Sequence, residues 1–232
     1  MMTDRTRYAL YFTPAQGSAL ERFGAAVLGY DCYTSEAVSH PELPGISPAE
    51  VSGMTAEPRR YGFHATLKPP FALKVGQSVE ALREAAAVFA ASRTEVTVGR
   101  LKVSALGPFI ALVPTAPPVE LGLLAAECVA TLDGFRAPLS EVDRRKRPGD
   151  GLSPRQQALQ ARWGYPYVLD EFRFHMTLTG GLPHDRRPVW LEALVTHADE
   201  FLLTLDAITL LIQPRPDSPF AVLERFSFQG GA

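Results

Sequence analysis

The sequence predicts a two-lobed α+β protein, because one pattern of residues occurs in it twice at a fixed spacing. The segment 63–67 (Phe-His-Ala-Thr-Leu) matches 174–178 (Phe-His-Met-Thr-Leu) at an offset of 175 − 64 = 111. The segment 108–112 (Pro-Phe-Ile-Ala-Leu) matches 219–223 (Pro-Phe-Ala-Val-Leu) at the same offset, 219 − 108. Self-similarity at one offset indicates an internal repeat.

Each copy has the order strand, helix, strand, strand. Apolar residues at helical spacing predict helices over 79–91 and 189–199. β-branched and aromatic residues predict strands after them, over 95–104 and 201–212. We therefore expect one bilobal domain over 1–232, with repeat copies at 59–113 and 170–228.

A shorter echo precedes each copy, in which a strand and a proline lead into a helix, at 8–28 and at 109–132. Two stretches rich in Pro, Gly and charge then interrupt the chain before each histidine strand, at 30–58 and 134–165. Long connections of this kind are usually functional. We interpret them as insertions or lids, and the basic run at 144–147 in the second one could steer an anion inward.

The composition is that of a folded protein without a strong electrostatic bias. Of the 232 residues, 46% are hydrophobic and 21% are charged, which excludes extensive disorder. The net charge of −2 gives no general attraction for a polyanion, so no long nucleic acid is expected as a partner. Any phosphate contact must come from a local cluster of residues.

The two cysteines, Cys32 and Cys128, have neither metal-ligand spacing nor the density of a disulfide framework. The polar residues 1–7 do not resemble a signal peptide, and no apolar stretch could span a bilayer. These features predict a cytoplasmic protein with no membrane partner; its oligomeric state is left open.

The repeated motif places a histidine and a threonine on the same face of a strand. Side chains alternate between the two faces, so His64 and Thr66 share one face. His175 and Thr177 do the same in the second copy. If the two copies are related by a pseudo-twofold axis, both imidazoles point into one cleft.

Two histidines suit the cleavage of a phosphodiester. One takes a proton from the attacking hydroxyl or water, and the other gives a proton to the leaving oxygen. Histidine can do either near neutral pH, and a neighbouring threonine hydroxyl can donate to a non-bridging oxygen. The scheme needs no metal or cofactor. The sequence does not say which histidine is the acid.

The motifs His64-Ala65-Thr66-Leu67 and His175-Met176-Thr177-Leu178 resemble those of the 2H phosphoesterase superfamily. The resemblance implies a pseudo-twofold-symmetric fold in which two antiparallel-rich sheets flank a central cleft, with helices outside. It also implies catalytic roles for His64, Thr66, His175 and Thr177, and action on small 2′,3′-cyclic, 2′-5′-linked or ADP-ribose cyclic phosphates.

Further segments are similar to a bacterial branch described as phosphonate-metabolism proteins. They are 59–64 (Arg-Arg-Tyr-Gly-Phe-His), 68–71 (Lys-Pro-Pro-Phe), 135–139 and 163–167, so the resemblance covers nearly the whole chain. It implies a small phosphorylated substrate, such as a cyclic ribose phosphate or an RNA-end cyclic phosphate.

Strand alternation also suggests cations at the cleft. Lys68 would share the His64 face and Arg173 the His175 face, unless both extend to solvent from a strand end. Arg60 and Arg136 are weaker candidates for binding phosphate. Tyr61 and Tyr165 could stack on a nucleobase, although such residues also pin loops to a core.

Two alternatives remain open at this point. A non-catalytic protein could use the cleft to bind a nucleotide or sugar phosphate. A metallohydrolase could use both histidines as ligands, but the sequence near them lacks a further ligand. Phosphate-cradling glycine loops and nucleophile elbows are also missing from the sequence.

Overall fold

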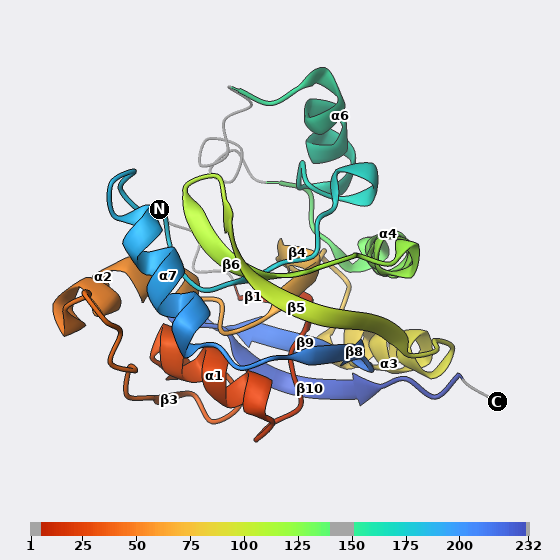
Figure 1. The fold of residues 1–232 in the computed structure, drawn as a ribbon. Helices are drawn as coiled ribbons and strands as arrows, with labels where there is room; N and C mark the ends of the chain where they lie inside the picture. Colours follow the sequence, from red (N-terminus) through yellow and green to blue (C-terminus); the bar gives the residue numbers. More distant parts are fainter. Residues whose placement is uncertain (1–5, 140–150, 231–232) are drawn as a thin grey trace.

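An eight-stranded antiparallel sheet forms the centre of the molecule (Figure 1). The computed structural model describes residues 6–139 and 151–230, so the basic run at 144–147 lies outside the described residues. The strand order is β10-β9-β1-β4-β7-β6-β5-β8. The strands are β1 (Arg7–Phe12), β4 (Ala65–Phe71), β5 (Val96–Leu106), β6 (Phe109–Pro114), β7 (Met176–Thr177), β8 (Leu202–Leu205), β9 (Ala207–Gln213) and β10 (Ala221–Ser227), with a separate hairpin of β2 (Tyr30–Asp31) and β3 (Glu36–Ala37).

The sheet consists of two four-stranded halves, and the predicted α+β class is confirmed. The halves meet where β4 pairs with β7 through Ala65 and Met176, so the two expected sheets join into one. From edge to centre the halves run β10-β9-β1-β4 and β8-β5-β6-β7. The halves do not coincide with the predicted repeat copies, because β4 lies in one half whereas β5 and β6 of the same copy lie in the other. The internal repeat therefore stays a prediction.

The predicted single β-rich stretch over 201–212 is two strands in different halves of the sheet. β8 pairs with β5, whereas β9 pairs with β1 and β10. Only Asp206 separates β8 from β9, so the sheet must curl to bring its two ends together, and Figure 1 shows β8 beside β9. Leu203, Leu205 and Ala207 are all buried. The alternation of buried and exposed side chains therefore continues from β8 into β9, and the sequence pattern gives no sign that the chain changes halves between them.

Helices cover the sheet and follow the sequence predictions closely. α3 packs on β9 and β10, α7 on β5, and α4 on β4. The helix α6 lies inside 134–165, and α2 lies inside 30–58 except for its last residue, Arg59; only insertions were expected in these segments. The helices are α1 (Ala19–Leu28), α2 (Pro48–Arg59), α3 (Val79–Ala91), α4 (Val119–Thr131), α6 (Pro154–Trp163) and α7 (Arg187–His197), with the short 3₁₀ turns η1 (Asp133–Phe135) and η2 (Leu169–Glu171).

Serines define the starts of four helices. Ser18, Ser47, Ser78 and Ser153 each accept a hydrogen bond from a backbone N–H in the first turn of α1, α2, α3 and α6. Such a cap satisfies one of the free donors at a helix start. Ser47 and Ser153 also precede a proline in the first turn, where its missing N–H costs nothing. Local sequence therefore sets these helix starts.

The helix-facing side of the sheet forms one continuous core. Leu10 and Phe12 of β1, Leu82 of α3, Leu112 of β6 and Trp190 of α7 all belong to it. The opposite side carries a smaller aromatic cluster. Because both halves contribute to one core, they are packed as a unit. No helix in the described ranges is long and apolar enough to cross a membrane.

Candidate active site

A cavity of about 520 Å³ opens where the two halves of the sheet meet. All four residues of the two motifs line it, together with Tyr61 and Tyr165 among the predicted binding residues. The other lining residues come from β1, the end of α2, the loop before β4, β4 itself, the turn between β5 and β6 with the start of β6, and the loop after β7. They are Tyr11, Glu57, Pro58, Gly62, Pro69, Pro70, Pro108, Phe109, Thr179, Gly180 and Gly181.

Strand register brings the two motifs together. Ala65 pairs with Met176 across β4 and β7 in antiparallel sense. Because antiparallel partners step in opposite directions, continuing this register places Thr66 beside His175 and His64 beside Thr177. Each histidine therefore lies next to the threonine of the other motif, across a local pseudo-twofold axis.

Gly62 sets the orientation of the His64 ring. His64 Nδ1 donates to the Gly62 carbonyl at 2.8 Å, which leaves Nε2 as the nitrogen with a free lone pair. Gly62 has φ = 71°, and a Cβ there would lie 2.7 Å from Cys32 Cβ, so only glycine fits without strain. His64 Nε2 lies 3.1 Å from Thr66 Oγ1, whose hydroxyl can donate to it.

The ring of Tyr11 covers one face of the His64 ring. The two rings stack with centroids 3.8 Å apart and an interplanar angle of 21°. Burial lowers the pKa of His64 to about 4; the Gly62 hydrogen bond opposes this shift, and charge repulsion from His175 adds to it. His64 is thus neutral at pH 7, and its Nε2 is ready to accept a proton.

His175 has the same anchor and a more open environment. Its Nδ1 donates to the Arg173 carbonyl at 2.7 Å, again two residues earlier in the chain. Phe109 lies 5.8 Å away between ring centroids and is tilted by 49°. Tyr11 pairs with Thr66, whereas the small Ala111 pairs with Thr177. The two histidines therefore share one local geometry but differ in what covers them.

Thr179, on the predicted polar face of the second copy, has a structural role. It is fully buried, and its Oγ1 accepts from the Ile110 N–H at 3.0 Å and donates to the Gly180 carbonyl at 2.9 Å. These bonds tie the end of the His175 strand to β6. Thr179 lines the cavity together with Thr66 and Thr177, but its hydroxyl is engaged in these two bonds.

Lys68 does not reach the cavity, which corrects the prediction from strand alternation. The register of β4 shifts after Thr66, so Thr66 pairs with Tyr11 but Lys68 pairs with Leu10. This bulge turns Lys68 to the core side, where it is only 1% exposed. Its Nζ donates to Asp133 at 3.0 Å and to the Val129 carbonyl at 3.3 Å.

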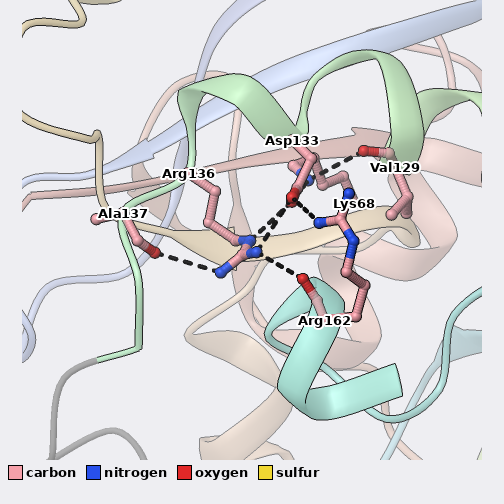
Figure 2. A network of polar contacts seen from close by, with 6 residues as sticks. All are labelled: Lys68, Val129, Asp133, Arg136, Ala137 and Arg162. Atoms are coloured by element: carbon pink, nitrogen blue, oxygen red, sulfur yellow. Dashed lines mark hydrogen bonds and ion pairs between the residues drawn. The ribbon is translucent and has the colours of Figure 1, made fainter. Parts of the chain in front are cut away.

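Arg136 also lies outside the cavity lining, because it belongs to the same ion cluster (Figure 2). Its Nε donates to Asp133 at 2.7 Å, and a second nitrogen donates to the Arg162 carbonyl at 3.0 Å. Burial raises the pKa of Asp133, but the hydrogen bonds and charges of Arg136 and Lys68 outweigh it and lower the pKa overall. The cluster connects β4, η1 and α6.

Arg60 and Arg173 are the other two predicted cations, and neither lines the cavity. Arg60 is exposed, and its guanidinium donates to the Pro216 carbonyl. Arg173 is exposed as well, and it is its carbonyl that contributes to the site by orienting His175. Within the described ranges, the cavity lining therefore contains no lysine or arginine.

The predicted aromatic residues are placed as expected. Tyr61 lines the cavity and stacks on Phe220 with ring centroids 5.8 Å apart. Tyr165 lines it from the segment after α6, in contact with Tyr167 at 5.6 Å between centroids. Both predicted insertions contribute to the wall, 30–58 through Glu57 and Pro58 and 134–165 through Tyr165.

Among the lining residues that sequence reasoning missed, Tyr11 and Glu57 bear most on the chemistry of the cavity. Tyr11 lies in β1, where alternation from the core residues Leu10 and Phe12 could have placed it on the other face. Glu57 lies in the last turn of α2, and no motif marks it. A search of the described residues finds no cluster of three His, Cys, Asp or Glu side chains that could hold a metal ion.

Comparisons with known proteins were made against families, curated sequences and solved structures. The family described as "Protein of unknown function (DUF1045)" matches residues 66–221. A ribose 1,5-bisphosphate phosphokinase PhnN of Janthinobacterium sp. (strain Marseille) is 40% identical, over 97% of this chain and 51% of the relative. A protein of the same name from Laribacter hongkongensis (strain HLHK9) is 34% identical, over 92% and 50%. The chain thus spans about half the length of these curated relatives.

Solved structures with a related chain trace share little sequence with this protein. TT0787 of Thermus thermophilus is 16% identical with a TM-score of 0.45, covering 98% of this chain and all of its own. LigT of E. coli complexed with 3′-AMP is 13% identical with a TM-score of 0.43, covering 97% and 98%. Likenesses of this strength say nothing about activity. The family match covers more than half of the chain, which therefore belongs to the DUF1045 family, in agreement with the resemblance drawn from its two histidine motifs.

Proposed function

We propose that this protein is a phosphodiesterase that opens a small cyclic phosphodiester of a ribose-containing molecule, with its two histidines as base and acid. The observation that carries the proposal is that His64, Thr66, His175 and Thr177 line one cavity, with both imidazoles anchored through Nδ1. This leaves Nε2 of each ring for proton transfer. The side chains themselves supply the acid and base, so the reaction needs no metal or cofactor.

In the proposed reaction His64 is the base. Water attacks phosphorus and loses a proton to Nε2 of His64, which its burial keeps neutral. The bond from phosphorus to one ring oxygen breaks, and His175 gives that oxygen a proton. The product is a phosphomonoester. The hydroxyls of Thr66 and Thr177 donate to the non-bridging oxygens, where negative charge develops.

The cavity suits a sugar phosphate or a mononucleotide. Its volume of about 520 Å³ falls in the range of small-molecule sites, and its aromatic wall offers flat surfaces for a sugar or base. The two relatives are named for a kinase of ribose 1,5-bisphosphate. Opening a ribose 1,2-cyclic phosphate gives a ribose 1-phosphate ester, the class of compound that such a kinase consumes. A 1,2-cyclic ribose phosphate is therefore the first substrate to test.

The test is turnover of ribose 1,2-cyclic phosphates, with and without a 5-phosphate, and of 2′,3′-cyclic nucleotides, in excess EDTA. We expect His64→Ala and His175→Ala each to abolish turnover. We expect Thr66→Ala and Thr177→Ala to slow it by roughly a hundredfold or more, as for loss of an oxyanion donor. His184→Ala, at an exposed histidine outside the cavity lining, is the matched control and should be fully active.

Full activity in either cavity histidine variant would overturn the proposal. Loss of activity on chelation would favour a metal-dependent hydrolase instead. Ligand-induced thermal stabilisation without any product, over the whole substrate panel and pH range, would favour the non-catalytic binding protein.

The name of the relatives favours a second candidate, phosphorylation of a ribose phosphate by ATP. The sequence contains no G-x-x-x-x-G-K-[ST] loop of the kind that cradles nucleotide phosphates, which favours the phosphodiesterase. Incubation of this chain with ATP, Mg²⁺ and ribose 1,5-bisphosphate separates the two. Consumption of ATP that depends on the sugar phosphate would establish the kinase.

A further inference from the structure

The active-site cavity has an unusual charge for a site that accepts phosphate. No lysine or arginine lines it in the described ranges, and the four cations expected there point elsewhere. The formally charged side chain in the lining is the carboxylate of Glu57. The other titratable groups of the lining are His64, His175 and three tyrosines, Tyr11, Tyr61 and Tyr165.

The turn that follows the His175 strand holds α2, the helix that carries Glu57, beside the cavity. The Gly180 N–H donates to the Met54 carbonyl at 2.7 Å, which fixes α2 against the turn that follows the His175 strand. A Cβ on Gly180 would lie 3.2 Å from that carbonyl oxygen and 3.8 Å from Glu57 Oε2, so the carboxylate borders the turn. Glu57 is exposed, and its side chain forms no hydrogen bond or ion pair within the described part of the chain.

The proposed reaction changes the charge of the bound phosphate. A phosphodiester carries one negative charge at neutral pH. The phosphomonoester product carries nearly two, because its second pKa is about 6. A fixed carboxylate in a cavity without lysine or arginine therefore disfavours the product more than the substrate.

We propose that Glu57 makes this cavity selective for singly charged phosphodiesters over doubly charged phosphomonoesters, and that it thereby promotes release of the product. The proposal rests on the proposed function for its catalytic meaning. Glu57 acts on the ligand through its charge, so Glu57→Gln, which keeps the shape, removes the selectivity.

The test uses two probes that differ in this charge and by one methyl group, 2′-deoxyadenosine 3′-phosphate and its methyl ester. Binding of each to wild type and to Glu57→Gln is measured by calorimetry at pH 7.5. We expect the monoester to bind the variant roughly three- to tenfold more tightly than wild type, and the methyl ester to change by less than about twofold. Glu42→Gln removes an exposed carboxylate of the same segment outside the cavity lining and should change neither affinity.

A second pH separates charge from shape. At pH 5 the monoester carries mainly one negative charge, so the advantage of the variant over wild type should disappear. His64 and His175 are present in both proteins, so the comparison between wild type and variant isolates the charge of Glu57. An equal gain for both probes, no gain for the monoester, or a gain that persists at pH 5 would each overturn the proposal.

The outcome can be told apart from a failure of the proposed function. Charge selectivity at Glu57 together with no turnover of any cyclic phosphate would overturn the catalytic function and keep the selectivity. Failure of wild type and variant to bind the monoester at millimolar concentration, together with turnover of a cyclic phosphate, would overturn the selectivity and keep the catalytic function.

Discussion

Two histidines with the same local geometry have different surroundings in this protein. Both donate Nδ1 to the carbonyl two residues earlier, so the local sequence His-x-Thr orients both rings alike. Tyr11 stacks on His64, whereas Ala111 stands at the position that corresponds to Tyr11 beside the His175 motif. Burial then lowers the pKa of His64, so that this histidine is neutral at pH 7.

The first prediction concerns Tyr11. Because the pKa of His64 is lowered to about 4 and the base must be deprotonated, kcat/KM should fall only as the pH drops through this value. Tyr11→Leu removes the flat ring and admits water, so the pKa should rise towards 6.5 and the acid limb of the pH profile should move up by about one pH unit. Tyr11→Phe, which keeps the ring, should leave the limb in place. An unmoved limb in the leucine variant would show that the stack does not control His64.

The second prediction concerns Gly62. Gly62→Ala introduces a Cβ at φ = 71° and within 2.7 Å of Cys32 Cβ. It should therefore lower the free energy of unfolding by about 2–3 kcal/mol and displace the His64 ring. Gly76→Ala is the matched control, because Gly76 has φ = 87° but open space around its Cβ position. It should cost only about 1 kcal/mol. Urea unfolding and kcat/KM of both variants check this, and equal losses would contradict the steric argument.

At the scale of elements, two polar clusters attach the inserted helices to the rest of the fold. The carboxylate of Asp133, in η1, forms ion pairs with Lys68 of β4, with Arg136 and with Arg162 of α6 (Figure 2). The carboxylate of Glu50, in α2, accepts hydrogen bonds from the guanidinium of Arg186 and from the indole N–H of Trp190 in α7. These contacts hold the segments that bring Tyr165 and Glu57 to the cavity.

The third prediction concerns the Asp133 cluster. Asp133→Asn leaves the buried Lys68 ammonium without its counter-charge and should cost about 3–5 kcal/mol of unfolding free energy. Arg162→Gln removes a partner whose side chain is 64% exposed. This change should cost less than about 1 kcal/mol. Chemical denaturation of both variants at pH 7 provides the comparison. A small loss for Asp133→Asn would mean that Lys68 is stable without the carboxylate.

At the scale of the whole molecule, the two halves share one core and one sheet. The chain leaves one half in β8 and enters the other in β9 after a single residue, Asp206. β4 and β7 meet in the middle of the sheet, and the largest hydrophobic cluster contains side chains from both halves. Most of the buried apolar side chains therefore pack in a core that both halves share.

The fourth prediction is that the molecule unfolds as one cooperative unit. Trp190 in α7 is fully buried in the shared core, so its fluorescence reports tertiary packing, while far-ultraviolet circular dichroism reports the helices and the sheet. In urea the two signals should change with coincident midpoints. A plateau between two separated transitions would show that the halves unfold independently.

Much of the site could be read from the sequence, because the information was local. The alternation that puts His64 with Thr66, and His175 with Thr177, depends only on consecutive residues, and all four line the cavity as predicted. Tyr61 and Tyr165 line it as well. The predicted positions of Lys68, Arg136, Arg60 and Arg173 were wrong. The bulge in β4 and the bond from Arg60 to the Pro216 carbonyl depend on partners far away in the sequence. Arg136 is held by Asp133, a partner three residues away that the sequence reasoning did not consider, and Arg173 is exposed.

The sequence by itself determined the α+β class, the helix starts at their serine caps and the two His-x-Thr motifs, since propensity, capping and strand alternation act over a few neighbouring residues. The tertiary structure alone decided that two sheets join at Ala65 and Met176, that Tyr11 covers one histidine, and that Glu57 supplies the charge of a cavity without cations among the described residues. These features arise from strand register and from packing between residues far apart in the chain. The residue type at one position does not indicate which distant side chain will contact it.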